Sequence, residues 1–457
     1  MTSPDVATGG HPDVYIPSYP SEQNVMILGN GGRESALTWI ARQDPQTGEI
    51  FVVPGNGGTE DFENTYQVGV DPNNHALVAE AARDYKAGLV IVGPEEPLVR
   101  GSADYLSEHG ILVYGPTQEM AQLEGSKAYA VDFMRQFGIP HPHSVIINSY
   151  EQGARFLGRN ASMKNPWFKD GIVVKADGLA AGKGVFVCHT YEEAQEALRI
   201  IMRDKSFGDA GNRVVLQEKL EGFELSAIAV CADGKYRLLP MTEDHKQAED
   251  GDKGPNTGGM GVVTPHPEVT PEMVQQIEET IIQPTLTGVH ARLGEHYRGT
   301  LYVGIMWTPK GPRVLEYNVR KGDPETQVQL VSLEDVHDFM FALYLAAQGR
   351  MDRTTPFKTK QSTLVGVTLA SRGYPGPYEK GTLITGVAEA QELPGVTIFH
   401  AGTKRENDQL VTSGGRVLYA VGEGETVKDA KEKAYTGVKT INFEGKTFRT
   451  DIPRPHR

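Results

Sequence analysis

Four apolar runs of strand length in the first 120 residues each end in a loop rich in glycine or proline, and this repeat restricts the fold more than any other feature. The runs lie at 25–29, 52–59, 89–98 and 112–117, with helical stretches between them. Apolar strands that alternate with helices indicate an open parallel sheet whose strand ends line a ligand crevice. One such loop alone is more often simple turn chemistry. Four loops at one end of the same sheet favour a binding site.

The first of these loops, N-G-G-R-E-S at 30–35, lies between a strand and a helix. The free N–H groups and the dipole of a helix N-terminus attract anions, so Gly31 and Gly32 are candidate binding residues. The loop is not the dinucleotide fingerprint, because Glu34 occupies the place of the third glycine. Arg33 and Glu34 are instead expected to form a charged pair at the mouth of the site.

A predicted strand over residues 314–320 carries three polar residues in alternation: Glu316, Asn318 and Arg320. The residues between them are expected to form an apolar floor: Leu315, Tyr317 and Val319. Carboxylate and amide oxygens suit Mg²⁺, and a guanidinium can bind a carboxylate or phosphate through two hydrogen bonds. A strand with one solvated face is the alternative. The G-D-P-E-T-Q loop that follows adds two acids and favours the metal site.

The segment at 172–187 reads as two strands joined by a loop rich in glycine and alanine, with Lys175 on the first strand and Lys183 in the loop. It fails the P-loop pattern, because 178–182 is one residue short and Gly184 stands where serine or threonine should follow the lysine. We expect a hairpin flap that covers nucleotide phosphates and neutralises them with two ammonium groups. A plain glycine-rich hairpin is the alternative, which the second lysine disfavours.

A strand–bend–strand pattern at 214–226 contains Glu218 and Glu224, which could contact a ribose and a metal, respectively, or be solvated acids.

Further along the chain, Asp244, His245 and Lys246 precede the loop G-D-K-G-P-N-T-G-G-M-G at 251–261. A loop with so many glycines indicates contact between backbone and ligand, or a mobile lid. A lone histidine would usually be structural, but these neighbours favour a ligand contact for His245.

The chain has 457 residues, which suggests two to four domains. Its net charge of −14 argues against non-specific binding to nucleic acid or membranes. The only cysteines, Cys188 and Cys231, lie in apolar runs and are expected to be buried thiols in a reducing compartment. No apolar run has membrane-spanning length, and the leader at 1–23 lacks the apolar centre of a signal peptide. We expect a disordered extension on a cytoplasmic protein.

Residue by residue, these runs resemble the phosphoribosylamine–glycine ligase family, the glycinamide ribonucleotide synthetases, which are ATP-grasp enzymes of purine biosynthesis. The resemblance extends from about residue 24 to 453 and includes G-N-G-G-R-E, P-G-N-G-G-T, G-P-E-E-P-L, Q-L-E-G-S-K, D-H-K, G-P-N-T-G-G-M-G, E-Y-N-V-R and G-D-P-E-T-Q. It implies an α/β fold with an N-terminal parallel-sheet domain (24–127), a central ATP-grasp domain of two subdomains (128–355) and a small β-rich C-terminal domain (356–457). The flap subdomain would span about 143–215.

The resemblance also implies the reaction. ATP phosphorylates the carboxylate of glycine, and the amine of 5-phosphoribosylamine attacks the glycyl phosphate to give glycinamide ribonucleotide, ADP and phosphate. The implied metal ligands for Mg²⁺ or Mn²⁺ are Glu316 and Asn318, and the implied ATP contacts are Lys127, Lys175, Lys183, Glu218 and Glu224. Catalytic roles fall to Arg320, Asp244, Lys183 and His245. The implied substrate contacts are Gly31, Gly32, Arg33, Glu34, Gly55, Asn56, Lys246, Asn256, Thr257, Gly258, Asp323 and Glu325.

Four positions depart from the family pattern: Ser35 replaces a histidine, Gly57 an alanine, Glu243 a glutamine and Lys321 an aromatic residue. The Ser35 hydroxyl is expected to cap the helix and to bond a phosphate oxygen. Lys321 alternates to the strand face opposite Arg320 and is expected to lie outside direct substrate contact.

These departures lie on the substrate side, so a paralogue that joins another amino acid or phosphosugar amine is the main alternative. A catalytically silent nucleotide-binding protein is the second, which the intact metal and lysine positions disfavour. Small molecules are the expected partners, and the protein could act as a monomer.

Overall fold

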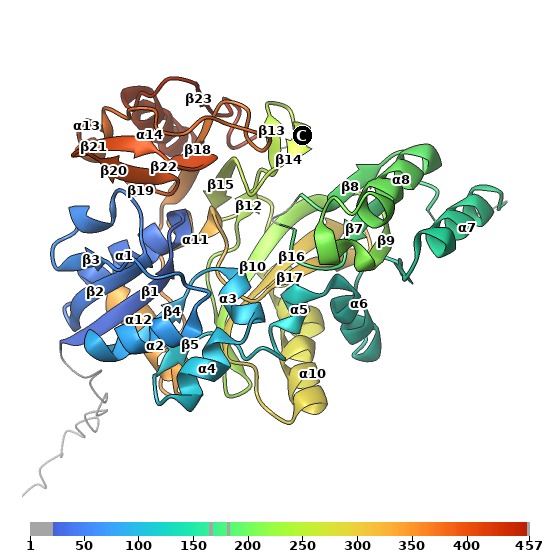
Figure 1. The fold of residues 1–457 in the computed structure, drawn as a ribbon, viewed down its shortest axis with the longest axis horizontal. Coiled ribbons are helices and arrows are strands. Elements are labelled where there is room, and N and C mark those ends of the chain that lie inside the picture. The colour runs from blue at the N-terminus through green and yellow to red at the C-terminus, as the bar shows by residue number, and fades with distance from the viewer. Residues whose placement is uncertain (1–21, 164–167, 181–182, 455–457) are drawn as a thin grey trace, which may run out of the picture.

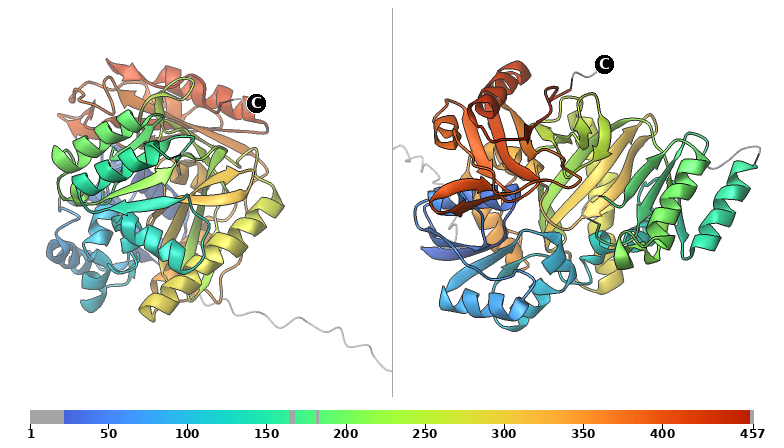
Figure 2. Two further views of the ribbon diagram at one scale, coloured as in Figure 1. Left: turned by 90° about the vertical axis from the view of Figure 1, so that its right-hand side faces the viewer. Right: turned by 45° about the horizontal axis from the view of Figure 1, so that its top comes forward.

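The computed structural model describes residues 22–163, 168–180 and 183–454. Residues 1–21 of the predicted extension, and Ala181 and Gly182 of the predicted flap loop, lie outside this range. Figure 1 shows the N-terminal part in blue and the C-terminal part in red side by side, with a central sheet between them and the green flap. The right view in Figure 2 shows the flap projecting away from the two terminal parts, and in the left view the flap faces the viewer.

The N-terminal part is a five-stranded sheet in the order β3-β2-β1-β4-β5, and every pair in it is parallel. Its strands are β1 (Gln23–Gly29), β2 (Thr47–Pro54), β3 (Thr65–Gln67), β4 (Ala87–Val92) and β5 (Val113–Tyr114). Its helices are α1 (Gly32–Gln43), α2 (His75–Asp84), α3 (Glu95–Val99) and α4 (Ser102–Glu108). The open parallel sheet predicted from the apolar runs is confirmed.

The flap is an antiparallel sheet in the order β6-β9-β7-β8. It consists of β6 (Ser144–Ile147), β7 (Ile172–Ala176), β8 (Val185–Cys188) and β9 (Val214–Glu218), with α7 (Tyr150–Ala161) and α8 (Tyr191–Leu198). These strands lie close to the predicted range of about 143–215. The predicted hairpin carrying Lys175 and Lys183 is β7–β8.

The central sheet has the order β11-β10-β16-β17 and is antiparallel. Its strands are β10 (Phe223–Ala232), β11 (Lys235–Leu238), β16 (Gly299–Thr308) and β17 (Gly311–Asn318). The helices α5 (Gln122–Gly125), α6 (Lys127–Gln136), α9 (Pro271–Ile277) and α10 (Gln283–Leu293) precede or connect these strands, and a π-helical turn at Glu278–Ile282 joins α9 to α10.

A β-bulge in β17 corrects the predicted apolar floor. Gly304 pairs with Glu316, whereas the next residue of β16, Ile305, pairs with Val314, so Leu315 is the extra residue. The bulge turns Val314 into the core beside Tyr317 and Val319, while Leu315 lies outside that core. The expectation that Leu315 shares the floor is therefore wrong, because an extra residue breaks strict alternation.

The C-terminal sheet takes two strands from the middle of the chain. Its order is β12-β15-β18-β22-β19, and β23 pairs with β18. These strands are β12 (Glu243–Asp244), β15 (Gly261–Thr264), β18 (Thr363–Ser371), β19 (Val396–His400), β22 (Arg416–Gly424) and β23 (Lys446–Thr447). Two small hairpins flank it: β13 (Gln247–Glu249) with β14 (Lys253–Asn256), and β20 (Thr403–Glu406) with β21 (Gln409–Thr412).

The remaining helices are α11 (Glu325–Val331), α12 (Val336–Ala347), α13 (Val387–Gln391) and α14 (Val427–Thr440). Residues of α11 and α12 share one buried apolar cluster with the N-terminal sheet, α1 and β10. This continuous core packs the first sheet against the central sheet. No helix in the described ranges is long and apolar enough to cross a membrane.

Candidate active site

Five charged side chains that the sequence singled out lie together beside β17. Lys246 Nζ is 3.5 Å from Glu316 Oε1 and 3.4 Å from Glu224 Oε2. Lys175 Nζ donates to the Leu315 carbonyl at 2.9 Å, so the bulge residue contributes its backbone to the cluster. Lys127 Nζ donates to the Gly178 carbonyl at 3.1 Å. The central sheet, α6, the flap and the segment between β12 and β13 thus supply one charged cluster.

The pKa values of this cluster show how strongly its members interact. Burial alone would raise the pKa of Glu316, but the ammonium groups of Lys246, Lys175 and Lys127 outweigh it and lower that pKa to about 2. Burial lowers the pKa of Lys175 to about 8, which Glu316 partly opposes. Glu316 is therefore ionised throughout the physiological pH range, and the cluster has an excess of positive charge beside it. Such an excess suits a polyphosphate.

The residues present fit a magnesium ion that arrives with a nucleotide. Glu316 offers an ionised oxygen, and Asn318 Oδ1 faces the site, where it accepts a hydrogen bond from Arg320 Nη2 at 2.9 Å. Among the described residues, no group of three or more His, Cys, Asp or Glu side chains could hold a metal alone. Two oxygen ligands plus phosphate oxygens are typical of Mg²⁺ sites, which seldom are all-protein cages.

The guanidinium of Arg320 is held by two acids from other elements. Its Nη2 lies 3.0 Å from Glu124 Oε1 and its Nε 3.4 Å from Glu95 Oε2. Burial, and to a lesser extent Glu95, raises the pKa of Glu124 to about 7, although Arg320 opposes this shift. A substrate carboxylate would have to share Arg320 with these acids or displace one of them.

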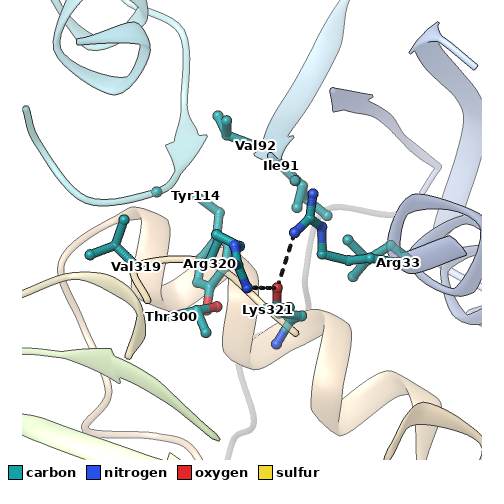
Figure 3. Close-up of a pocket in the computed structure, with 11 residues that line it drawn as sticks. Arg33, Ile91, Val92, Tyr114, Thr300, Val319, Arg320 and Lys321 are labelled. Atoms are coloured by element: carbon teal, nitrogen blue, oxygen red, sulfur yellow. Dashed lines mark hydrogen bonds between the residues drawn. The ribbon is translucent and has the colours of Figure 1, made fainter. Parts of the chain in front are cut away.

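Arg33 and Arg320 also converge on one backbone oxygen (Figure 3). Arg33 Nη1 donates to the Lys321 carbonyl at 3.1 Å and Arg320 Nη1 at 3.2 Å. Both arginines line a narrow cavity of about 10 Å³, enough for a single water molecule. This carbonyl links the first glycine loop to the end of β17.

Lys321 lies three residues beyond the end of β17. Its side chain turns away from the two arginines, as alternation along the predicted strand implied, but it is fully enclosed. It is 3% exposed, and its Nζ lies 4.7 Å from the ring centroid of Phe339 and 6.0 Å from that of Tyr114. Nζ has no hydrogen-bond partner in the described structure. Burial lowers its pKa to about 7. Alternation in the sequence predicted the direction of the Lys321 side chain, but it did not predict that this side chain is buried.

The first glycine loop corrects the predicted charged pair at the mouth. Arg33 and Glu34 are both buried, with Arg33 Nε 2.5 Å from Glu34 Oε1. Glu34 Oε2 accepts the Gly31 N–H at 2.7 Å and so caps the start of α1. A Cβ at Gly93 would lie 2.0 Å from Glu34 Oε1, which explains the glycine there. Glu34 therefore occupies the space under the loop, where the dinucleotide fingerprint has a glycine.

The second glycine loop is fixed mainly by its own contacts. Gly55 has φ +78°. Asn56 Nδ2 donates to the Asn30 carbonyl at 3.1 Å and to the His400 carbonyl at 3.2 Å, and its Oδ1 accepts the Gly58 N–H at 3.0 Å. The Asn56 side chain thus joins both glycine loops to the C-terminal sheet, whereas the sequence predicted a substrate contact.

Asp244 is a half-buried acid in an unusual environment. Burial raises its pKa well above the usual range, and the neighbouring Glu325 raises it further. Its Oδ1 has no hydrogen-bond partner in the part of the chain that the structure describes. Glu325 is itself held by the Tyr302 hydroxyl at 2.5 Å and by Ser226 Oγ at 3.2 Å. A cation placed beside Asp244 would relieve this desolvation.

His245 lies next to Asp244 but is directed away from the cluster. Its Nδ1 lies 3.3 Å from the Gly261 carbonyl, and its Nε2 accepts the Arg454 N–H at 3.2 Å. Burial, followed by the charge of Arg449, lowers its pKa to about 4. Both ring nitrogens contact backbone groups, so the geometry favours a positioning role over the predicted ligand contact.

The glycine-rich loop at 251–261 is anchored at several points, which disfavours the predicted free lid. Thr257 Oγ1 donates to the Lys246 carbonyl at 2.8 Å, and Gly258 N donates to the Tyr374 hydroxyl at 3.0 Å. Asn256, at the end of β14, pairs with Gln247 of β13. These contacts join the loop to Lys246 and to the C-terminal part.

Two predicted ATP contacts lie apart from the cluster. Lys183 is exposed in the turn that leads into β8. Glu218 Oε1 accepts the His143 N–H at 2.8 Å and so supports the segment that enters the flap. Closure of the flap is the motion that would bring Lys183 towards bound phosphates.

Comparison with known families identifies the protein. Three family descriptions match in order: "Phosphoribosylglycinamide synthetase, N domain" at 23–124, its "ATP-grasp (A) domain" at 125–326 and its "C domain" at 364–454. The chain belongs to the phosphoribosylglycinamide synthetase family. The phosphoribosylamine–glycine ligase of Pseudomonas aeruginosa is 44% identical over 435 residues, which cover 94% of this chain and 97% of the relative. That of Rhodopirellula baltica is 41% identical over 434 residues, with the same coverage.

Solved structures agree with this assignment. The phosphoribosylamine–glycine ligase of Thermotoga maritima superposes with a TM-score of 0.79 at 36% identity, covering 94% of this chain and 99% of that one. The biotin carboxylase domain of Hydrogenobacter thermophilus 2-oxoglutarate carboxylase has a TM-score of 0.70 at 15% identity, over 94% of this chain and 92% of that one, and shows the shared fold alone. The predicted ATP-grasp architecture of the synthetase is confirmed.

Two departures from the family pattern face the C-terminal part of this synthetase, not the ligand. Ser35 Oγ accepts the His400 N–H at 3.2 Å and is buried, which corrects the expected phosphate contact. The expected helix cap is also wrong, because Ser35 lies inside α1, whose N-cap residue is Gly31. A Cβ at Gly57 would lie 2.7 Å from Leu410 Cδ1 and 3.0 Å from the Lys404 nitrogen. Both small residues therefore permit close packing of residues 400–410 on the glycine loops.

Sequence reasoning missed the roles of Glu95, Glu124 and Arg416. Arg416 Nη1 donates to the carbonyls of Gly258 and Asp323, each at 2.6 Å, and Arg416 helps lower the pKa of the Asp323 carboxyl against the effect of burial. The motifs G-P-E-E-P-L and Q-L-E-G-S-K contain the two acids. The structure shows their role, because both acids form ion pairs with the Arg320 guanidinium.

Proposed function

We propose that this synthetase joins glycine to 5-phospho-D-ribosylamine with ATP, through glycyl phosphate, to give glycinamide ribonucleotide, ADP and phosphate. Family membership over nearly the whole chain supports the reaction. The observation that carries the site assignment is the partly buried cluster of Lys127, Lys175 and Lys246 around the ionised Glu316. That cluster supplies positive charge where a phosphoryl group is transferred.

Glu316 and Asn318 would hold Mg²⁺ or Mn²⁺, which when bound shields the phosphate oxygens during transfer. Lys127 and Lys175 neutralise phosphate charge from α6 and the flap. Lys183 joins them when the flap closes and excludes water from the hydrolysable glycyl phosphate.

Glycine would lie between Asp244 and Arg320. The unpaired, buried oxygen of Asp244 accepts the glycine ammonium, which restores the ionised form of Asp244. Arg320, held in place by Glu95 and Glu124, orients the carboxylate. His245 keeps Asp244 and Lys246 in position through its backbone contacts.

The phosphoribosyl group would occupy the crevice at the ends of β1, β2 and β4. Gly31, Gly32 and Gly55 present backbone there, while Arg33 and Asp323 lie at its edge. Asn256, Thr257 and Gly258 close the site from the side of the C-terminal sheet. Since no side chain acts as nucleophile, catalysis rests on positioning and charge stabilisation.

A direct assay tests this proposal. ADP release is measured with freshly prepared phosphoribosylamine and, in turn, glycine, alanine, serine and aspartate. Glycine should be preferred by at least tenfold in kcat/KM. A clear preference for another acid would favour the paralogue, and nucleotide binding without ADP release would favour a silent binding protein. The cytoplasmic location and the monomeric state remain predictions from the sequence.

A further inference from the structure

A surface cavity of about 510 Å³, widely open to solvent, lies at the end of α6 remote from the charged cluster, where the chain turns from Phe137 to His143 into the flap. α6 begins at Lys127, and the cavity includes residues around Gly138. At 1.5 Å per residue, these ends are separated by roughly 16 Å along the helix. Neither the sequence motifs nor the proposed reaction uses this cavity.

The cavity combines an apolar floor with basic walls. Met134, Ile139 and Pro140 form the floor, and the first two are buried. The walls carry Arg135, His141 and Arg313, one from α6, one from the linker and one from β17. A basic cavity is notable in a chain with net charge −14, because an anion can be attracted there only by local charge.

The charge of these walls is only partly neutralised. Arg135 Nη1 lies 3.4 Å from Asp132 Oδ1, an exposed pair that is screened by water, and its Nη2 donates to the Ser144 carbonyl. Arg313 Nη1 donates to the Pro312 carbonyl at 2.9 Å, and this arginine forms no ion pair within the described ranges. Burial lowers the pKa of His141, and the charges of Arg135, His143 and Arg313 lower it further. The positive charge of the walls therefore comes from the two arginines, Arg135 and Arg313, and not from the imidazole.

We propose that this cavity is a second anion site, separate from the nucleotide site, and that it takes a phosphate monoester carried on a small ring. Two guanidinium groups match phosphate geometry, and the floor of Met134, Ile139 and Pro140 accepts the ring. The volume lies in the range of small-molecule sites.

The position of the cavity gives such a ligand access to the base of the flap. Val314 N donates to the Pro140 carbonyl at 2.8 Å, and Glu218 N donates to the His143 carbonyl at 2.9 Å. The linker is therefore bonded to β17 at one point and to β9 at another. A ligand held by Arg135, His141 and Arg313 spans the same junction between the ATP-grasp base and the flap.

Calorimetric titration of the full chain with phenyl phosphate tests the site. A non-hydrolysable ATP analogue, Mg²⁺ and glycinamide ribonucleotide are kept saturating so that the reaction site is filled. We expect one phenyl phosphate per chain with a submillimolar Kd, and no binding of phenol. Arg313→Gln should weaken binding by about tenfold or more, since it removes a charge-assisted contact. The matched variant Arg372→Gln, at an exposed arginine of the C-terminal part, should bind as the wild type does.

Three results would overturn the proposal: no binding to the saturated wild type, unchanged affinity in Arg313→Gln, or competition by the ATP analogue. If sulfate binds as tightly as phenyl phosphate, the ring does not contribute to binding, and the proposal of a ligand that carries a ring is wrong. Circular dichroism and the thermal midpoint of Arg313→Gln establish that the variant is folded, so that its loss of binding is attributable to the site.

Discussion

At the scale of single residues, burial of the Lys321 amine at the edge of the site lowers the free energy of unfolding. Its amine is enclosed by Phe339 and Tyr114 and lacks a hydrogen-bond partner among the described residues. Its pKa is about 7 in the folded chain, against an ordinary value of 10.5. Between these values the unfolded chain binds one more proton than the folded chain, so this group makes stability rise with pH over that range.

Lys321→Met should therefore raise the free energy of unfolding, on the order of 3 kcal/mol at pH 6, because a thioether needs no desolvation of charge. The gain should shrink as pH increases from 7 towards 10.5. Urea denaturation at several pH values measures it, and Lys428→Met, at an 85% exposed lysine, serves as the control with little effect. A gain independent of pH would contradict a neutral amine in the folded state.

Glu316→Gln should lower kcat by about two orders of magnitude or more, because it removes the charge that Lys246, Lys175 and Lys127 surround and that a metal requires. Steady-state rates at saturating Mg²⁺ measure the effect. Glu221→Gln changes an exposed acid near the flap and should behave as the wild type does. If Glu316→Gln keeps its activity within a few-fold, the assignment of Glu316 on β17 as a metal ligand is wrong.

At the scale of elements, the sequence pattern predicted the elements that depend on local residues. It did not predict features that depend on contacts with other segments. The parallel N-terminal sheet and the β7–β8 hairpin follow from local patterns of apolar residues and glycine. The bulge at Leu315 does not, because its register depends on pairing with the neighbouring strand β16, which the alternation within β17 itself does not reveal. For the same reason, the direction of His245 and the partners of Ser35 could not be predicted: each depends on a C-terminal residue, Arg454 and His400 respectively.

The flap hairpin yields a kinetic prediction. Lys183→Ala should raise the apparent KM for ATP and lower kcat, because this exposed lysine reaches the phosphates only in the closed form. The KM for glycine should change much less. Lys169→Ala, at a 76% exposed lysine of the same subdomain, is the matched control. Equal losses for both substrates would indicate that the loop shapes the fold instead.

The contact between the second glycine loop and the β20–β21 hairpin yields a prediction about stability. Gly57→Ala should destabilise the chain by about 1–2 kcal/mol, since its Cβ meets Leu410 and Lys404. Leu410→Ala should restore part of this loss in the double variant, because it removes the atom at 2.7 Å. Thermal or urea unfolding of the four proteins in this cycle measures the coupling. Additive losses would show that the two residues do not compete for space.

At the scale of the whole molecule, Arg449 near the C-terminus binds the β13–β14 hairpin, which comes from the middle of the chain. Arg449 is fully buried, and its guanidinium contacts Asp252 at 2.9 Å, Asp451 at 2.8 Å and the Gln247 carbonyl at 3.2 Å. These bonds hold the β13–β14 hairpin against the end of the chain, close to Asp244 and Lys246.

Arg449→Met should therefore cost on the order of 3 kcal/mol of stability, because it leaves Asp252 and Asp451 without their buried partner. Hydrogen exchange should increase first in the β13–β14 hairpin. Arg405→Met removes a half-exposed ion pair with Asp61 and should cost far less. Unchanged protection of the hairpin would mean that Arg449 does not anchor it.

The entry of β12 and β15 into the C-terminal sheet also affects the order of events during synthesis. Their partner β18 ends at Ser371, and β18 in turn needs β22, which ends at Gly424. A ribosome makes the chain from the N-terminus, so Asp244 cannot acquire its final neighbours until more than 100 further residues have emerged. A nascent chain can therefore complete its first sheet early, but it cannot bind and activate an amino acid before β18 and β22 have been made.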